Sequence, residues 1–180
     1  MMKKFYFSMF AMMIMAVVCA GFASCGSDDD DDDDGKTNSL VDSRVLGTWT
    51  STIGEGWTWD HGVLTDHWKD ESATRTRNYI IVNGVETGEY TVYTRDEPEW
   101  TTVTFNADGS FMGSNDEESG ITGSFTAQNG VLTYISMIGA DQWNYSFEGT
   151  TMKLVQEEES YDIKQREINW YVKGLYQAGM

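Results

Sequence analysis

The stretch ITGSFTAQNGVLTYISMI, residues 121–138, places two runs rich in β-branched and aromatic residues on either side of Gln128-Asn129-Gly130. Runs of this composition favour β-strands, and a short connection containing Asn-Gly favours a tight hairpin between them. The same arrangement recurs at residues 77–94, where Asn83-Gly84 separates the two runs. The stretch therefore predicts an antiparallel hairpin of a kind that the chain uses more than once.

The rest of the chain after residue 40 repeats this alternation of strand-like runs and turn residues. Consecutive strands joined by tight turns favour an up-and-down meander, and closing it into a barrel removes the exposed edges that invite aggregation. We therefore expect an all-β fold, an antiparallel up-and-down β-barrel of about eight to ten strands. A β-sandwich is the alternative, because hairpin signals do not show where a sheet closes. The other expected strands are residues 45–53, 77–82, 86–94, 100–106, 143–149, 151–157 and 164–173, with one more beginning at Ser110.

Several short motifs resemble one family of barrels. Leu46-Gly47-Thr48-Trp49 resembles the G-x-W start of lipocalin-like domains. The resemblance covers most of residues 40–173 and implies that Trp49 packs across the closed end of the barrel, near an arginine from a late strand. Arg166 is the nearest candidate for that arginine, and both residues would be structural. The hairpins TVTFNADGSF (102–111), GSFTAQNGVLTY (123–134) and YSFEGTTMKL (145–154) resemble those of lipocalin-like domains in secreted bacterial lipoproteins.

The N-terminus has the composition of an export signal. Two lysines in MMKK precede a nearly unbroken apolar stretch from Phe5 to Ala23, and small residues stand directly before Cys25. As a helix the apolar stretch would reach roughly 28 Å, close to the thickness of a hydrocarbon core, so an uncleaved membrane anchor is the alternative. The small residues beside a cysteine favour cleavage instead.

The residues around Cys25 also resemble a known processing motif. Phe22-Ala23-Ser24-Cys25 resembles the lipobox of bacterial lipoproteins, with phenylalanine in place of the usual leucine. The seven aspartates of residues 28–34 resemble the acidic export tag of Bacteroidota surface lipoproteins. The resemblance implies a signal peptide at 1–24, a lipid such as palmitate on Cys25, an acidic tether at 25–39 and a barrel domain at 40–180. It also implies attachment to the outer membrane through the lipid, facing the cell exterior.

Composition narrows the function of the expected domain. Residues 40–180 contain 22 acidic and 9 basic side chains, a formal charge of −13. Such a surface repels nucleic acid and anionic lipid, which excludes both as ligands of the domain itself. The domain contains no cysteine, because Cys19 lies in the signal, so disulfides and thiolate metal sites are excluded.

One segment between two expected strands is unusually rich in aromatic and histidine residues. It is GEGWTWDHGVLTDHWKDESATR, residues 54–75, in which WDH and DHW mirror each other as the arms of a small hairpin would. Long ordered connections often carry function or additional strands. The candidate ligand-binding residues are Trp57, Trp59, His61, His67 and Trp68.

Three interpretations of this segment stay open. The histidines with Asp60 or Asp66 are acceptable metal ligands, but their spacing matches no standard site and we expect no metal. The tryptophans are suitable stacking surfaces for a sugar or an apolar ligand, in the place where lipocalin-like proteins often have a lid. The third interpretation is an additional hairpin whose side chains simply cover the barrel.

The sequence favours a binding protein over an enzyme. It contains no G-x-S-x-G and no H-E-x-x-H motif, and nothing in it indicates a cofactor. We expect a barrel that binds a small apolar or amphipathic ligand. The alternative is a glycan-binding or assembly subunit of a surface nutrient-uptake system, using exposed tryptophans. Rings that line a cavity would favour the first function, and an exposed ring platform the second.

Overall fold

The computed structural model describes residues 41–115, 119–137 and 139–176. These residues lie in one compact unit, Leu40–Met180. The expected signal peptide (1–24) and tether (25–39), with Cys25, lie outside the described residues.

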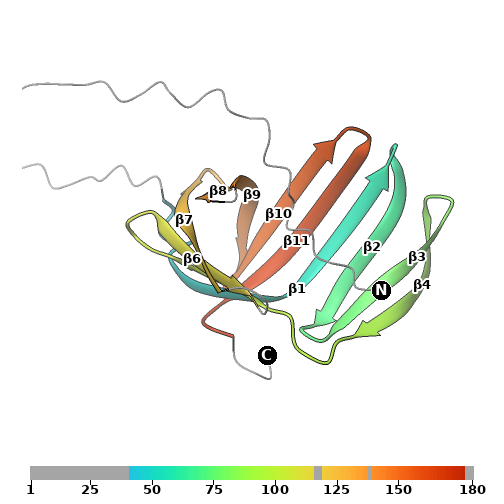
Figure 1. The fold of residues 1–180 in the computed structure, drawn as a ribbon, viewed down its shortest axis with the longest axis horizontal. Coiled ribbons are helices and arrows are strands. Elements are labelled where there is room, and N and C mark those ends of the chain that lie inside the picture. The colour runs from blue at the N-terminus through green and yellow to red at the C-terminus, as the bar shows by residue number, and fades with distance from the viewer. Residues whose placement is uncertain (1–40, 116–118, 138, 177–180) are drawn as a thin grey trace, which may run out of the picture. The chain divides into compact units, whose positions relative to one another are not determined.

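The described residues form antiparallel strands and turns and contain no helix (Figure 1). Their order along the chain is a meander in which nearly every strand pairs with its sequence neighbour. The strands are β1 (Gly47–Asp60), β2 (Val63–Ser72), β3 (Arg75–Val82), β4 (Val85–Thr94), β5 (Thr101–Phe105), β6 (Ser110–Asn115), β7 (Ser119–Gln128), β8 (Val131–Ser136), β9 (Gly139–Glu148), β10 (Thr151–Ser160) and β11 (Ile163–Lys173).

Eight of these strands close into a barrel, as the sequence predicts. The ladder runs from β5 through β11, and β1 pairs with β5 on one edge and with β11 on the other. This closure distinguishes the barrel from the alternative β-sandwich. The Asn-Gly hairpins are also confirmed: Asn83-Gly84 and Asn129-Gly130 both have positive φ at the two central positions, 52° and 79° in each case. That backbone matches the type I′ turn, which twists in the same sense as the flanking strands.

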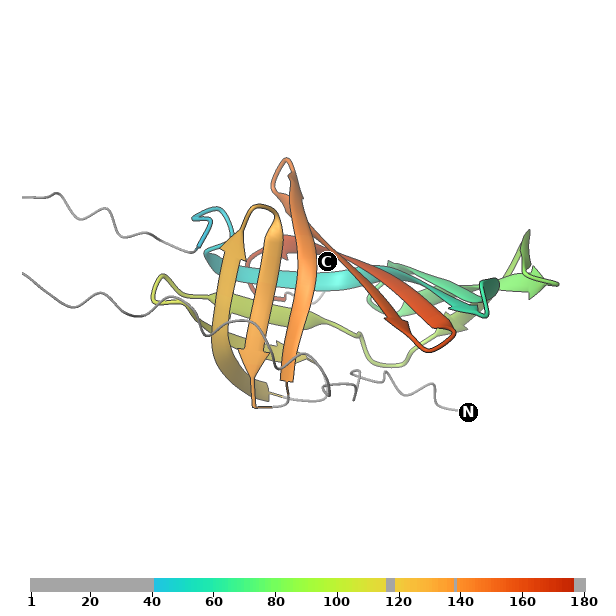
Figure 2. The same ribbon diagram turned by 90° about the horizontal axis from the view of Figure 1, so that it is seen from above.

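The other three strands form a sheet outside the barrel. Residues 47–51 of β1 pair with β5, whereas residues 55–60 pair with β2, so β1 leaves the barrel halfway along its length. The far ends of β10 and β11 leave with it. These three ends and β2, β3 and β4 make up a single-layer sheet, here called the extension sheet, which projects beyond the barrel (Figure 2).

A β-bulge in β1 separates its two halves. Ser51 pairs with Tyr171 and Ile53 pairs with Trp170, which leaves Thr52 as an extra residue. Because side chains alternate along a strand, one extra residue moves every later side chain to the opposite face. Trp57, eight residues after Trp49, therefore lies on the outer face of the sheet although Trp49 points into the barrel.

The interior of the barrel is filled by its own side chains. Aromatic and aliphatic residues from all eight strands contact one another across the barrel, as is usual when about eight strands close. Phe105, for example, contacts Phe125 with ring centroids 4.6 Å apart and Tyr134 at 5.7 Å. The buried cluster is Val45, Trp49, Val103, Phe105, Phe111, Phe125, Ala127, Leu132, Tyr145, Met152, Leu154 and Tyr171.

Trp49 is buried in the barrel, and the basic side chain beside it is not the expected one. Its indole is 1% exposed, and its Nε1 donates a hydrogen bond of 2.6 Å to the carbonyl of Val45. The prediction that Arg166 lies near it is wrong. Lys173 lies over the Trp49 ring with its Nζ 4.9 Å from the centroid, whereas Arg166 lies 5.7 Å from the ring centroid of Trp57. The strand register explains this, because Trp49 pairs with Lys173 and Trp57 pairs with Arg166.

Candidate functional site

The aromatic segment forms the hairpin of β1 and β2, which extends away from the barrel. The structure brings Trp57, Trp59 and His67 to the outer face of the extension sheet and places Trp68 on the opposite face. His61 occupies the turn, with a φ of 51° and its Nδ1 2.6 Å from a carboxylate oxygen of Asp60. The five candidate residues therefore do not converge on one site.

On the outer face, four rings form a row across four strands. The Trp57 and His67 rings stack with centroids 4.9 Å apart, and His67 stacks on Tyr79 at 4.2 Å. Tyr79 then contacts Tyr90 edge to face at 6.0 Å. This aromatic row uses its ring faces internally, and Arg166 covers the outer side of Trp57. It is therefore a cross-strand structural element and not a free stacking platform.

His67 is the centre of this row and is 6% exposed. Its Nδ1 lies 2.7 Å from Oε2 of Glu86 on β4, and its Nε2 lies 3.1 Å from Oε1 of Glu55 on β1. Both ring nitrogens therefore lie within hydrogen-bonding distance of a carboxylate oxygen. The side chain thus links three strands, and both its nitrogens are engaged.

The opposite face of the extension sheet carries Trp68. Its indole lies against the backbone of Gly54 and Gly56, so that a Cβ on Gly56 would stand 2.5 Å from Nε1. No larger residue fits at Gly56 without displacing the ring. Because the two glycines have no side chains, Trp68 packs directly against their backbone.

A polar network centred on Asp70 lies next to Gly54. Asp70 accepts hydrogen bonds from the Gly54 amide at 3.0 Å and from the Thr76 hydroxyl at 2.5 Å. Arg95 donates to the same hydroxyl at 2.6 Å. Burial raises the pKa of Asp70, and the hydrogen bond from Thr76 and the charge of Arg95 oppose that rise. The network supplies hydrogen-bond donors to a largely buried carboxylate.

The face of β11 that carries Tyr171 into the barrel carries a second carboxylate, that of Glu167, four residues earlier on the strand. Burial raises the pKa of Glu167, whose Oε1 accepts a 2.7 Å hydrogen bond from Nδ2 of Asn169. Burial also raises the pKa of Tyr171. The inner surface thus changes from apolar to polar where the extension sheet leaves the barrel.

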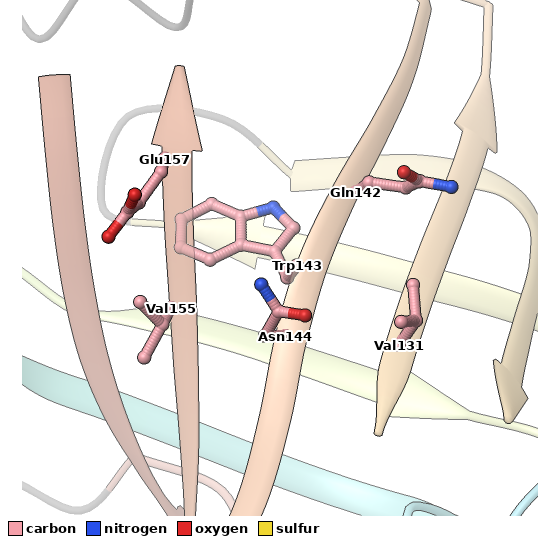
Figure 3. A pocket seen from close by; sticks show the side chains of 6 residues that line it. All are labelled: Val131, Gln142, Trp143, Asn144, Val155 and Glu157. Carbon is pink, nitrogen blue, oxygen red and sulfur yellow. The ribbon is translucent and has the colours of Figure 1, made fainter. Parts of the chain in front are cut away.

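The structure opens a pocket on the side of the barrel where two neighbouring strands separate. The last pair between β9 and β10 is Asn144 with Val155, and beyond it the two strands diverge. The pocket has a volume of about 240 Å³. It is lined by Val131, Gln142, Trp143, Asn144, Val155 and Glu157 (Figure 3).

The lining combines one large aromatic ring with apolar and polar groups. The Trp143 indole extends from β9 toward β10, with Val155 and Glu157 beside it (Figure 3), and it also packs against the core cluster. Glu157 is held by Lys164 and Arg166, with N–O distances of 3.4 and 3.5 Å. An aromatic wall with a few polar groups around it is typical of small-molecule binding sites.

No signal in the sequence pointed to this pocket. Trp143 begins an expected strand, where an aromatic residue is ordinary, and the partners that make the pocket come from three different strands. What creates the pocket is the divergence of β9 from β10, which no local pattern encodes.

Comparisons with known proteins do not place this chain. No family model, curated protein or solved structure matches it. The described residues include no helix that is able to cross a membrane, and no group of three or more His, Cys, Asp or Glu side chains in them is arranged to hold a metal ion.

Proposed function

We propose that this protein is an exported lipoprotein, tethered to the outer membrane through Cys25, whose barrel domain is a binding module at the cell surface. The lipobox-like residues and the seven aspartates of residues 28–34 support the tether. A run of seven like charges is typical of a solvated tether, and the repulsion between an acidic domain and an anionic membrane surface is compatible with attachment through such a tether.

The binding site in this proposal is the pocket between β9 and β10, and the filled barrel is the observation that favours it. A ligand enclosed in the barrel would have to displace the cluster around Phe105 and Leu132, which are 1% and 0% exposed. Opening such a core costs several kcal/mol, which is comparable to the free energy of unfolding of a typical domain. The ligand is therefore held at the surface, where Trp143 and its neighbours already form a cavity.

The size and chemistry of the pocket favour a small amphipathic ligand. Its volume of about 240 Å³ lies below the range of about 300–1,000 Å³ for sites that hold drug-sized molecules. Trp143, Val131 and Val155 offer apolar surface, and the amides and the carboxylate offer hydrogen bonds. A single ring or a short chain with polar substituents matches this lining.

The test is native mass spectrometry of the full-length protein, extracted in detergent from its own host. We expect a small molecule to co-purify with the wild type and to be lost from a Trp143→Ala variant. A molecule that is retained by that variant, or the absence of any bound molecule in the wild type, would contradict the proposed site.

The tether is tested separately by metabolic labelling with palmitate. We expect label in the wild type and none in a Cys25→Ala variant, with residues 1–24 missing from the mature wild-type protein by intact mass. Equal labelling of the two proteins would contradict lipidation at Cys25.

A further inference from the structure

We propose that the pocket between β9 and β10 binds one neutral sugar ring of a glycan, with the ring lying against the Trp143 indole. The inference rests on the proposed function, because it names the chemical class of the ligand for the same site. The combination of aromatic, amide and carboxylate groups that line the pocket supports a sugar as the ligand.

Trp143 supplies a surface of fixed orientation. The indole is half-buried and packs against the core cluster. It therefore loses little side-chain freedom when a ligand binds, which favours affinity. The apolar C–H face of a sugar ring fits a flat, rigid aromatic face of this kind.

The polar groups around the indole are those that hydroxyl groups need. Asn144 is exposed, and within the described part of the chain its amide makes no side-chain hydrogen bond, so that it is free to donate and accept. Among the described residues, the Gln142 amide makes a long contact of 3.4 Å to the Thr133 hydroxyl. Amides offer both donors and acceptors, which matches the mixed character of a sugar hydroxyl.

Glu157 adds an acceptor that is already held in place. Lys164 and Arg166 contact its two oxygens, at 3.4 and 3.5 Å, and balance its charge. The carboxylate still has lone pairs for a hydroxyl donor. Hydrogen bonds to charged groups are stronger than neutral ones, so this contact orients the ring.

The same lining disfavours the other ligand classes. An acyl chain would form no hydrogen bonds with Asn144, Gln142 or Glu157, and would use only the apolar part of the lining. An anion is disfavoured by the domain as a whole, which has a formal charge of −13. A neutral polyhydroxylated ring satisfies both the indole and the polar groups.

The size of the pocket limits the contact to a single ring. A volume of about 240 Å³ has no room for an extended oligosaccharide, and Gln142, Asn144 and Glu157 are all exposed at its rim. A longer glycan would therefore place one unit in the pocket and continue into solvent.

The experiment is a titration of the full-length protein, in detergent micelles, with a panel of neutral oligosaccharides and methyl glycosides by isothermal titration calorimetry. We expect at least one member to bind, with affinity reduced about tenfold or more in Trp143→Ala, as expected for loss of one aromatic contact. Trp143→Phe is expected to retain part of the affinity, which separates loss of the ring from loss of the fold. Trp100→Ala is the matched control, because Trp100 stacks on Tyr176 and lies outside the pocket.

Three outcomes overturn the inference and differ in what they leave standing. If no sugar binds, but native mass spectrometry finds an apolar molecule that Trp143→Ala loses, the sugar is wrong and the proposed binding site stands. If no sugar binds and nothing co-purifies, both fall. Sugar binding that is equal in the Trp143→Ala and Trp100→Ala variants also overturns the inference, because the site then lies elsewhere.

Discussion

The barrel and the extension sheet are built from the same long strands but are held together by different forces. In the barrel, β1 contributes Trp49 to a closed apolar core. In the extension sheet the same strand lies in a single layer, and every residue of its outermost strand β4 is exposed. The barrel is stabilised mainly by burial of apolar surface. The extension sheet depends on cross-strand pairs such as the aromatic row and on the contacts of His67.

The bulge at Thr52 is what lets one strand serve both regions. It moves the later side chains of β1 to the other face, so that Trp57 joins the aromatic row on the outside while Gly54 and Gly56 face Trp68. Without the extra residue, Trp57 would continue the inward face of Trp49. We therefore expect mutations in the two regions to differ in how much they lower the free energy of unfolding and in how many strands they affect.

The largest expected effect is in the barrel. Phe105→Ala is expected to lower the free energy of unfolding by about 3–5 kcal/mol, as for other large aromatic side chains removed from a core. Trp57→Ala in the aromatic row is expected to cost about 1 kcal/mol, the scale of an aromatic pair. Urea denaturation measures both. Equal losses in the two variants would contradict the distinction between the two regions.

The next effect is local to the extension sheet. His67→Ala leaves the carboxylates of Glu55 and Glu86 without their common partner and is expected to cost about 1–3 kcal/mol. Amide hydrogen exchange should speed up in β2, β3 and β4 and stay unchanged in β5–β9. His61→Ala is the control, since His61 is 72% exposed and its loss should change stability little. Faster exchange throughout the barrel would show that the two regions unfold as one.

A smaller effect is expected where the two regions meet. Burial raises the pKa of Glu167 above that of a carboxyl in the unfolded chain, so the unfolded state loses its proton first as pH rises. The contribution of Glu167 to stability is therefore lost as pH rises from the ordinary carboxyl pKa through the raised one. Glu167→Gln keeps the acceptor for Asn169 and should be more stable than the wild type at pH 7. The two should converge at low pH in thermal melts, and a less stable variant at pH 7 would contradict this assignment.

The smallest effect is expected at Asp42, in the segment that precedes β1. The hydrogen bond from the Arg44 side chain, with other contacts, lowers the pKa of Asp42 to about 2. Its stabilising contribution is present above the ordinary carboxyl pKa of about 3.9 and is lost as pH falls toward 2. Asp42→Asn should cost less than about 1 kcal/mol at pH 7, because the pair is at the surface. Denaturation at pH 7 and pH 2 should show a difference only at the higher pH, and a difference that persists at pH 2 would point to the Tyr145 contact instead.

The parts of the fold that local chemistry determines were predictable from the sequence. Asn83-Gly84 and Asn129-Gly130 have a strong preference for type I′ turns, and alternating β-branched residues led to an antiparallel barrel. The partner of Trp49 was not predictable, because Arg166 and Lys173 are both basic and only the register of β1 against β11 separates them. Register depends on pairing between distant segments and on a bulge that no local motif marks.

The candidate site shows the same limit. The sequence singled out Trp57, Trp59 and Trp68 for their density in one segment, yet alternation and the bulge send them to two faces. Trp143 does not stand out in the sequence, because its neighbours are ordinary strand residues. Its pocket forms only where β9 separates from β10. A pocket between strands is a property of the closed sheet, so a pattern along one strand does not reveal it.

The most direct test of the central claim is a titration followed by NMR of the tryptophan indole N–H groups. The chain has seven tryptophans, and Trp49 and Trp143 report on the inside of the barrel and on the pocket. Addition of the ligand identified by native mass spectrometry or calorimetry is predicted to shift the Trp143 signal and to leave the Trp49 signal in place. A shift of Trp49 with Trp143 unchanged would show that the ligand enters the barrel, and would contradict a filled scaffold with its binding site outside.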